Sequence, residues 1–164
     1  MPATLSTARR SAWADLRMHN QVLFLCTGNY YRSRFAEYLF NHHAQAYRLP
    51  WRADSRGLAI ELLERDAGPI SPHTLRGLAL RRIPPEPVRP PISVTEPDLQ
   101  RARLIVALKR SEHQPMLQQK FPDWAERVEY WQVDDIGDTH PDRALPQIET
   151  AVLALLERLA GGGR

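Results

Sequence analysis

The sequence predicts an α/β fold, a three-layer sandwich in which a parallel sheet lies between helices on its two faces. Short apolar runs that are typical of strands alternate along the chain with longer segments of helical periodicity. Strands joined through helices pair in parallel, and right-handed crossovers place those helices on both faces. A length of 164 residues and an apolar content of 43% fit one globular domain.

Four segments are expected to form the sheet. The apolar run from Val22 to Leu25 predicts a buried strand, and so does the run from Leu104 to Leu108. The predicted strands cover 21–26, 51–58, 104–108 and 127–133. Helices are predicted over 33–47, 72–82, 111–120 and 141–159, with a short one that opens at Thr95.

Residue types at the helix ends support these boundaries. Ser33 is a favourable N-cap type for the first helix, and Ser71 followed by Pro72 is typical of an N-cap and first helical residue. The closing helix is predicted from apolar residues at spacings of three and four, namely Leu145, Ile148, Val152, Leu155 and Leu159.

The chain is expected to comprise an N-terminal extension over 1–20, a folded domain over 21–160 and a loose tail over 161–164. Within the extension, Ala8 to Met18 is weakly amphipathic and predicts a short helix or a frayed terminus. The extension lacks the apolar core of a secretory signal, and no apolar run is long enough to span a membrane. With one cysteine, an internal disulfide is excluded, so a reducing, cytoplasmic location is expected.

Charge and composition bound the partners. The formal net charge is +3, and no basic run is interleaved with aromatics, so neither nucleic acid nor a membrane is expected as a partner. Arginines other than Arg32 are interpreted as solvated surface residues. The pair His42 and His43 lacks further ligands at metal spacing, so no metal is expected. The proline-rich segment 84–91 is interpreted as an ordered connector in preference to a partner-binding motif.

The chemistry is predicted from the residues that follow the first strand. Cys26 ends the apolar run, five residues follow, and Arg32 and Ser33 open a helical segment. Backbone N–H groups of such a loop and helix start converge on phosphate oxygens, and their positive field favours a thiolate. Gly28 permits a close backbone approach, and Asn29 tolerates the left-handed region.

This spacing suits phosphoryl transfer through a cysteinyl-phosphate. Cys26 would attack phosphorus, Arg32 would grip two equatorial oxygens with its fork, and the Ser33 hydroxyl would stabilise the leaving thiolate. The alternative is that Cys26 is a buried structural cysteine and that Arg32 only lies on the surface. The expected phosphate-binding loop consists of Thr27, Gly28, Asn29, Tyr30, Tyr31 and Ser33.

Cleavage of an aryl ester also needs a proton donor. Three carboxylates, Asp134, Asp135 and Asp138, follow the last predicted strand and so lie at the same sheet edge as the loop. The alternative is that all three only cap the closing helix or its loop.

The stretch from Val22 to Glu37, VLFLCTGNYYRSRFAE, resembles the signature of the low-molecular-weight protein tyrosine phosphatases. The resemblance extends to about Leu159. It implies a four-stranded parallel sheet, a Cys nucleophile, a phosphate-binding Arg, and an Asp acid, for which Asp135 is the matching position. It further implies phosphorylated proteins or small aryl phosphates as substrates, no cofactor, a bracing role for Ser55, and a cleft wall in 59–70.

Several positions depart from that family pattern. Pro87, Val88 and Arg89 stand where a bracing His and basic residues are common, which puts the bracing network in doubt. Ile136 replaces a Pro after the expected acid, and Tyr31 lies where many members carry a second Cys. Two other functions therefore stay open. One is arsenate reduction with an external thiol, and the other is a non-catalytic phosphate- or phosphopeptide-binding module.

Overall fold

The structure, a computed structural model, describes residues 19–86 and 88–162. The expected amphipathic segment Ala8 to Met18, Pro87 and residues 163–164 of the expected tail therefore lie outside the described residues. None of the helices in the described ranges has the length and hydropathy of a membrane-spanning segment.

Four parallel strands form a single sheet, which confirms the predicted fold class. They are β1 (Asn20–Cys26), β2 (Trp51–Gly57), β3 (Leu104–Ala107) and β4 (Glu129–Tyr130), in the order β2-β1-β3-β4. β4 is much shorter than the predicted 127–133. After Tyr130 the parallel ladder ends, and the chain continues beside 107–110 through single backbone hydrogen bonds and an isolated antiparallel bridge between Gln132 and Lys109.

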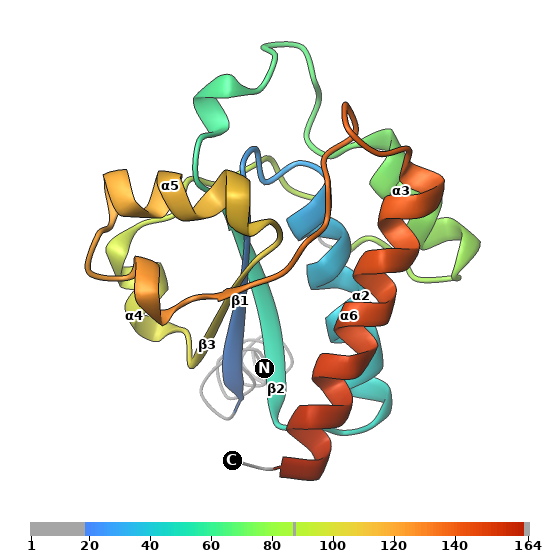
Figure 1. Ribbon diagram of the computed structural model, residues 1–164. Helices are drawn as coiled ribbons and strands as arrows, with labels where there is room; N and C mark the ends of the chain where they lie inside the picture. The colour runs from blue at the N-terminus through green and yellow to red at the C-terminus, as the bar shows by residue number, and fades with distance from the viewer. Residues whose placement is uncertain (1–18, 87, 163–164) are drawn as a thin grey trace, which may run out of the picture.

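Helices cover both faces of the sheet, as Figure 1 shows. One layer consists of α2 (Arg32–Ala46), α3 (Pro72–Leu80) and α6 (Pro141–Gly162), and the other of α4 (Glu96–Arg101) and α5 (Arg110–Lys120). Two single turns, η1 (Ile60–Leu62) and η2 (Ala125–Arg127), complete the described elements.

Alternate residues of β1 supply the two cores. Val22 and Phe24 pack with the core that contains α2 and α6, whereas Leu23 and Leu25 pack with the core on the α4 and α5 side. Because side chains alternate along a strand, this pattern requires a strand that is buried on both faces. The continuous apolar run in the sequence is the signature of that environment.

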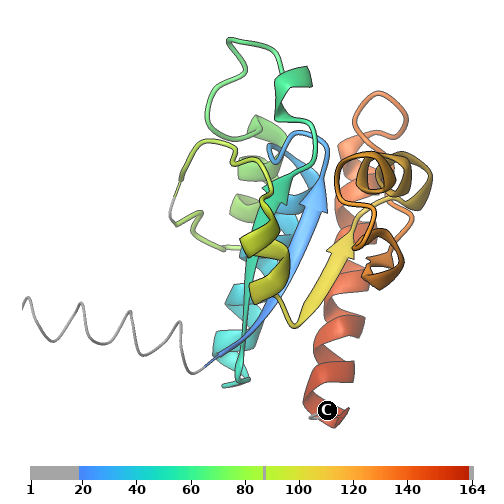
Figure 2. The same ribbon diagram turned by 90° about the vertical axis from the view of Figure 1, so that its left-hand side faces the viewer.

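The fold also fixes where a ligand can bind. From β1 the chain passes to β2 on one side, while β3 pairs with β1 on the other, so the strand order reverses beside β1. In open parallel sheets the crevice at such a reversal, at the carboxyl ends of the strands, is the usual ligand site. Figures 1 and 2 both show the segments that follow β1, β2 and β4 gathered at this end of the sheet.

Candidate active site

The loop between β1 and α2 forms the base of a pocket of about 550 Å³. Cys26 ends β1 and is 3% exposed, and five residues lie between it and Arg32, which begins α2. Asn29 has a φ of 49°, in the left-handed region that was expected for it. The pocket is lined by Cys26, Thr27, Gly28, Tyr30, Tyr31, Arg32, Leu62, Leu63, Glu112, Met116, Asp135, Ile136, Gly137 and Asp138.

The buried Ser33 hydroxyl lies beside the sulfur. The Sγ of Cys26 is 2.9 Å from the Oγ of Ser33, and the Asn29 amide donates to that same oxygen at 2.9 Å. Ser33 is not the N-cap of α2, as the sequence suggested, because Tyr31 occupies the cap position and makes no side-chain capping bond. Ser33 lies inside the first turn of α2, where its hydroxyl oxygen accepts from the Cys26 thiol and from the Asn29 amide.

Arg32 is buried and held from one side. Its Nη2 donates to Glu112 at 2.5 Å and its Nη1 donates to the carbonyl of Val133 at 3.0 Å. Glu112 thus occupies the edge formed by Nη1 and Nη2, where a second, longer contact of 3.4 Å completes the pair. A guanidinium has a second donor edge, formed by Nε and Nη2, and this is the fork that can face a phosphoryl group.

Glu112 is a site residue that sequence reasoning missed. Besides Arg32, it accepts hydrogen bonds from the hydroxyl of Thr27 and from Nε2 of His113, the latter at 3.0 Å. The amide of Lys109 donates to Nδ1 of His113, so the neutral ring carries its proton on Nε2. Burial opposes ionisation, but the bonds from His113 and Arg32 outweigh it and bring the pKa of Glu112 well below its usual range.

The three candidate proton donors have different surroundings. Asp135 lines the pocket, is 49% exposed and lies 3.7 Å from Nη2 of Arg32. Asp134 turns away to an ion pair with Lys109 and accepts the Thr139 hydroxyl at 2.9 Å; these bonds lower its pKa. Asp138 also lines the pocket, and among the described residues it forms no ion pair with Arg32. Of the three candidate proton donors, Asp135 is therefore the one that both lines the pocket with Cys26 and faces Arg32.

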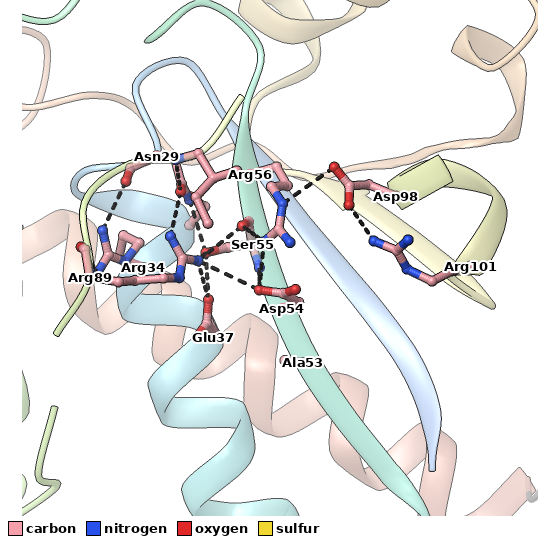
Figure 3. Close-up of polar contacts among 12 residues, drawn as sticks. Asn29, Arg34, Glu37, Ala53, Asp54, Ser55, Arg56, Arg89, Asp98 and Arg101 are labelled. Atoms are coloured by element: carbon pink, nitrogen blue, oxygen red, sulfur yellow. Dashed lines mark hydrogen bonds and ion pairs between the residues drawn. The ribbon is translucent and has the colours of Figure 1, made fainter. Parts of the chain in front are cut away.

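A buried polar network holds the loop from behind (Figure 3). The Asn29 amide donates to the hydroxyl of Ser55 on β2, which in turn donates to Glu37 at 2.6 Å. Arg89 completes the network, since its guanidinium donates to Oδ1 of Asn29 and to Glu37, both at 3.0 Å. Ser55 thus contacts the loop through Asn29, and Arg89 occupies the bracing position that the sequence left in doubt.

Arg34 ties the loop to the proline-rich segment. It is fully buried, and its guanidinium donates to the carbonyls of Asn29 at 3.2 Å, Pro69 at 3.0 Å and Arg89 at 2.7 Å. The amide of Ile92 also donates to Oδ1 of Asn29. The interpretation of every arginine except Arg32 as a solvated surface residue is therefore wrong for Arg34 and Arg89. The ordered-connector interpretation of 84–91 agrees with these contacts.

The upper wall of the pocket is largely apolar. Leu62 and Leu63, which come from the segment after β2, line the pocket together with Met116 of α5 and Ile136. The sequence placed one cleft wall in 59–70 without naming its residues, and these two leucines supply it. An apolar slot above an anion-binding loop can accommodate a flat ring that carries a phosphoryl group.

Replacement of Arg89 by alanine should lower the free energy of unfolding by about 3 kcal/mol at neutral pH, since it leaves a buried carboxylate unpaired. Burial raises the pKa of Glu37, whereas the Ser55 hydrogen bond and the Arg89 charge lower it. Loss of the Arg89 charge should therefore raise the pKa of Glu37 further. A carboxyl whose pKa is higher in the folded than in the unfolded protein stabilises the fold at pH values below its unfolded-state pKa. That stabilisation is lost as the pH rises through its folded-state pKa. The deficit should therefore be smaller at about pH 5 than at about pH 8.

Urea unfolding at both pH values measures this difference. Arg89→Lys keeps a charge and should restore part of the loss, whereas Arg65→Ala, at an exposed arginine, is the matched control and should stay within about 0.5 kcal/mol of the parent. A deficit that is equal at both pH values would show that the Arg89 contact with Glu37 does not carry the effect.

Known proteins place the chain in a family. The family model described as low molecular weight phosphotyrosine protein phosphatase matches residues 21–161. No curated protein matches the chain. The solved structure of a low molecular weight protein tyrosine phosphatase from T. tengcongensis is 26% identical, with a TM-score of 0.72, and the match covers 85% of this chain and 99% of that chain.

Two further structures share the fold at lower identity. One is VcLMWPTP-2 from Vibrio cholerae O395, with 22% identity, a TM-score of 0.75, and coverage of 88% of this chain and 99% of that chain. The other is Vibrio vulnificus Wzb in complex with benzylphosphonate, with 18% identity, a TM-score of 0.73, and coverage of 86% and 99%. Because the family match extends over most of the chain, the resemblance to this family that the loop signature indicated is confirmed. The chain belongs to the low molecular weight phosphotyrosine protein phosphatases, a family of hydrolases.

Proposed function

We propose that this chain hydrolyses phosphomonoesters, with phosphotyrosine as the substrate class, through a cysteinyl-phosphate and without a metal. The observation that carries the proposal is the convergence of Cys26, Arg32 and Asp135 on one pocket. A nucleophile, an anion-binding fork and an acid are the groups that a two-step phosphoryl transfer needs.

In the first step the Cys26 thiolate attacks phosphorus as the phosphorus–oxygen ester bond breaks. The Nε and Nη2 edge of Arg32 and the loop amides bind the equatorial oxygens, on which charge spreads in the transition state. Asp135 gives its proton to the departing aryl oxygen, so the phenol leaves neutral. The products of this step are the phenol, a phosphocysteine and an ionised Asp135.

In the second step water hydrolyses the phosphocysteine. Asp135, now a carboxylate, takes a proton from the water as its oxygen bonds to phosphorus and the sulfur–phosphorus bond breaks. The Ser33 hydroxyl, 2.9 Å from the sulfur, donates to the thiolate as it leaves. Inorganic phosphate departs, and Cys26 and Asp135 are back in their starting protonation states.

A phosphate-binding module without turnover is the second candidate, and Glu112 is the observation that favours it. Its carboxylate lies on Arg32 and partly neutralises the charge that an incoming phosphoryl group would meet. The sulfur–serine contact and the position of Asp135 in the pocket support turnover instead, because binding alone needs neither. No contact among the described residues specifically favours arsenate reduction.

Turnover of para-nitrophenyl phosphate and of a phosphotyrosine peptide tests the proposal. We expect hydrolysis of both, competitive inhibition by vanadate, and no loss of rate with a chelator. Acid quenching during turnover of a radiolabelled substrate should trap phosphate on Cys26 and on no other residue. Tight phosphate binding without hydrolysis would establish the binding module, and activity that requires an added metal would refute the mechanism.

A further inference from the structure

Tyr31 carries a buried hydroxyl that the proposed mechanism does not use. Its side chain is 4% exposed, and the hydroxyl has no hydrogen-bond partner among the described residues. The neighbouring Tyr30 differs, since its hydroxyl donates to the carbonyl of Ala67. Because a buried polar group without a partner destabilises a fold, phenylalanine would suit the position better on stability alone.

The position of Tyr31 connects it to the reacting groups. It lines the same pocket as Cys26 and Asp135, and it is the last residue before Arg32. Burial raises the pKa of Tyr31 to about 12, the Asp135 charge adds to this, and Arg32 opposes it. The hydroxyl is therefore neutral at physiological pH and acts only as a proton-holding donor.

Asp135 is free to meet such a donor. One of its oxygens, Oδ1, accepts from the amide of Ile136 at 2.9 Å, and the other lies 3.7 Å from Arg32. At 49% exposure, its side chain has room to turn further into the pocket. The charged and titratable groups around it are Cys26 at the end of β1, Arg32 of α2, Glu112 and His113 of α5, and Asp138 of its own loop.

We infer that Tyr31 is a positioning residue for Asp135: when a phosphoryl group occupies the loop, Asp135 turns inward and one carboxyl oxygen accepts the Tyr31 hydroxyl. The other oxygen is then directed toward the ester oxygen and, in the second step, toward the attacking water. No proton moves between the two residues. This inference rests on the proposed function, because it assigns Tyr31 to the same reaction.

The variant Tyr31→Phe separates this role from packing. We expect kcat to fall about five- to tenfold, the effect of one hydrogen bond to a charged group. Without the donor, the Asp135 carboxyl should keep its proton to higher pH. The high-pH limb of the kcat–pH profile, which Asp135→Asn should abolish, should therefore move up by about half a pH unit. Loss of the unpaired hydroxyl should raise the Tm of the unliganded protein by about 3 °C.

Two matched variants complete the test. Tyr30→Phe removes a hydroxyl that has a partner, so its Tm should fall and the Asp135 limb should stay in place. In an Asp135→Ala background, Tyr31→Phe should have no further effect on kcat, because the acceptor is gone. An unchanged limb, or an undiminished effect of Tyr31→Phe in that background, would overturn the inference.

Failure of this inference differs from failure of the proposed function. If the parent protein turns over and Tyr31→Phe matches it in kcat and pH profile, only the role of Tyr31 is refuted. If the parent protein shows no turnover, the proposed function fails. The contact between Tyr31 and Asp135 can then still be tested by the thermal stabilisation that orthovanadate gives. Orthovanadate should raise the Tm of the parent more than that of Tyr31→Phe, and equal shifts, or none in either, would refute the contact.

Discussion

Replacement of Cys26 by serine should lower kcat at least about 10⁴-fold while phosphate still binds. Serine keeps the size of the side chain, but its hydroxyl is a far weaker nucleophile than a thiolate at neutral pH. Phosphate is held by loop amides and the Arg32 fork, which the substitution leaves in place. Binding of phosphate should therefore be retained in the variant.

Steady-state rates with an aryl phosphate and calorimetric titration with inorganic phosphate measure the two halves of this prediction. Ser33→Ala is the matched control, since it removes the hydroxyl 2.9 Å from the sulfur and keeps the nucleophile. Its kcat should fall by about 10- to 100-fold, which corresponds to about 1.4 to 2.8 kcal/mol. A Cys26→Ser protein that retains even a few per cent of the parent rate would exclude covalent catalysis by this sulfur.

Local signals in the sequence are enough to predict which residues meet at the centre of the candidate site. A strand, a loop and a helix that follow one another within Val22 to Glu37 bring Cys26, Asn29 and Arg32 close together, and bonds from distant segments then hold Asn29 and Arg32 in place. Local sequence also accounts for the two cores, because alternation along β1 is a property of the strand alone. The fold class followed from this order of elements, and the structure confirms it.

Contacts between distant segments could not be predicted in this way. Glu112 is 80 positions from Arg32, and nothing in the periodicity of α5 distinguishes it from a solvated carboxylate. Arg34 and Arg89 were assigned to the surface because arginine is usually exposed. Arg34 is fully buried and the Arg89 side chain is 17% exposed, because carbonyls and carboxylates of several segments converge on their guanidinium groups, a property of the assembled fold. The short β4 likewise depends on where Gln132 bridges to Lys109.

The second large effect is expected at Asp135, and it should depend on the leaving group. Asp135→Asn should lower kcat/KM for a phosphotyrosine peptide by about 10²- to 10³-fold, since a phenol with a pKa of about 10 needs a proton to leave. The loss should be much smaller with para-nitrophenyl phosphate, whose phenolate leaves readily without one. A rate deficit that grows with the basicity of the leaving group identifies a proton donor, whereas a misfolded pocket would impair both substrates equally.

Asp134→Asn is the matched control, because it makes the same chemical change at the adjacent residue. Asp134 is paired with Lys109 and Thr139, so its loss should alter the position of the loop slightly and leave the leaving-group dependence intact. If Asp134→Asn instead gave the steeper dependence on leaving-group basicity, the acid would be Asp134. The loop that carries Asp134 and Asp135 would then have to change conformation when substrate binds. The two carboxylates thus compete for one role, and the substrate series decides between them independently of any change in stability.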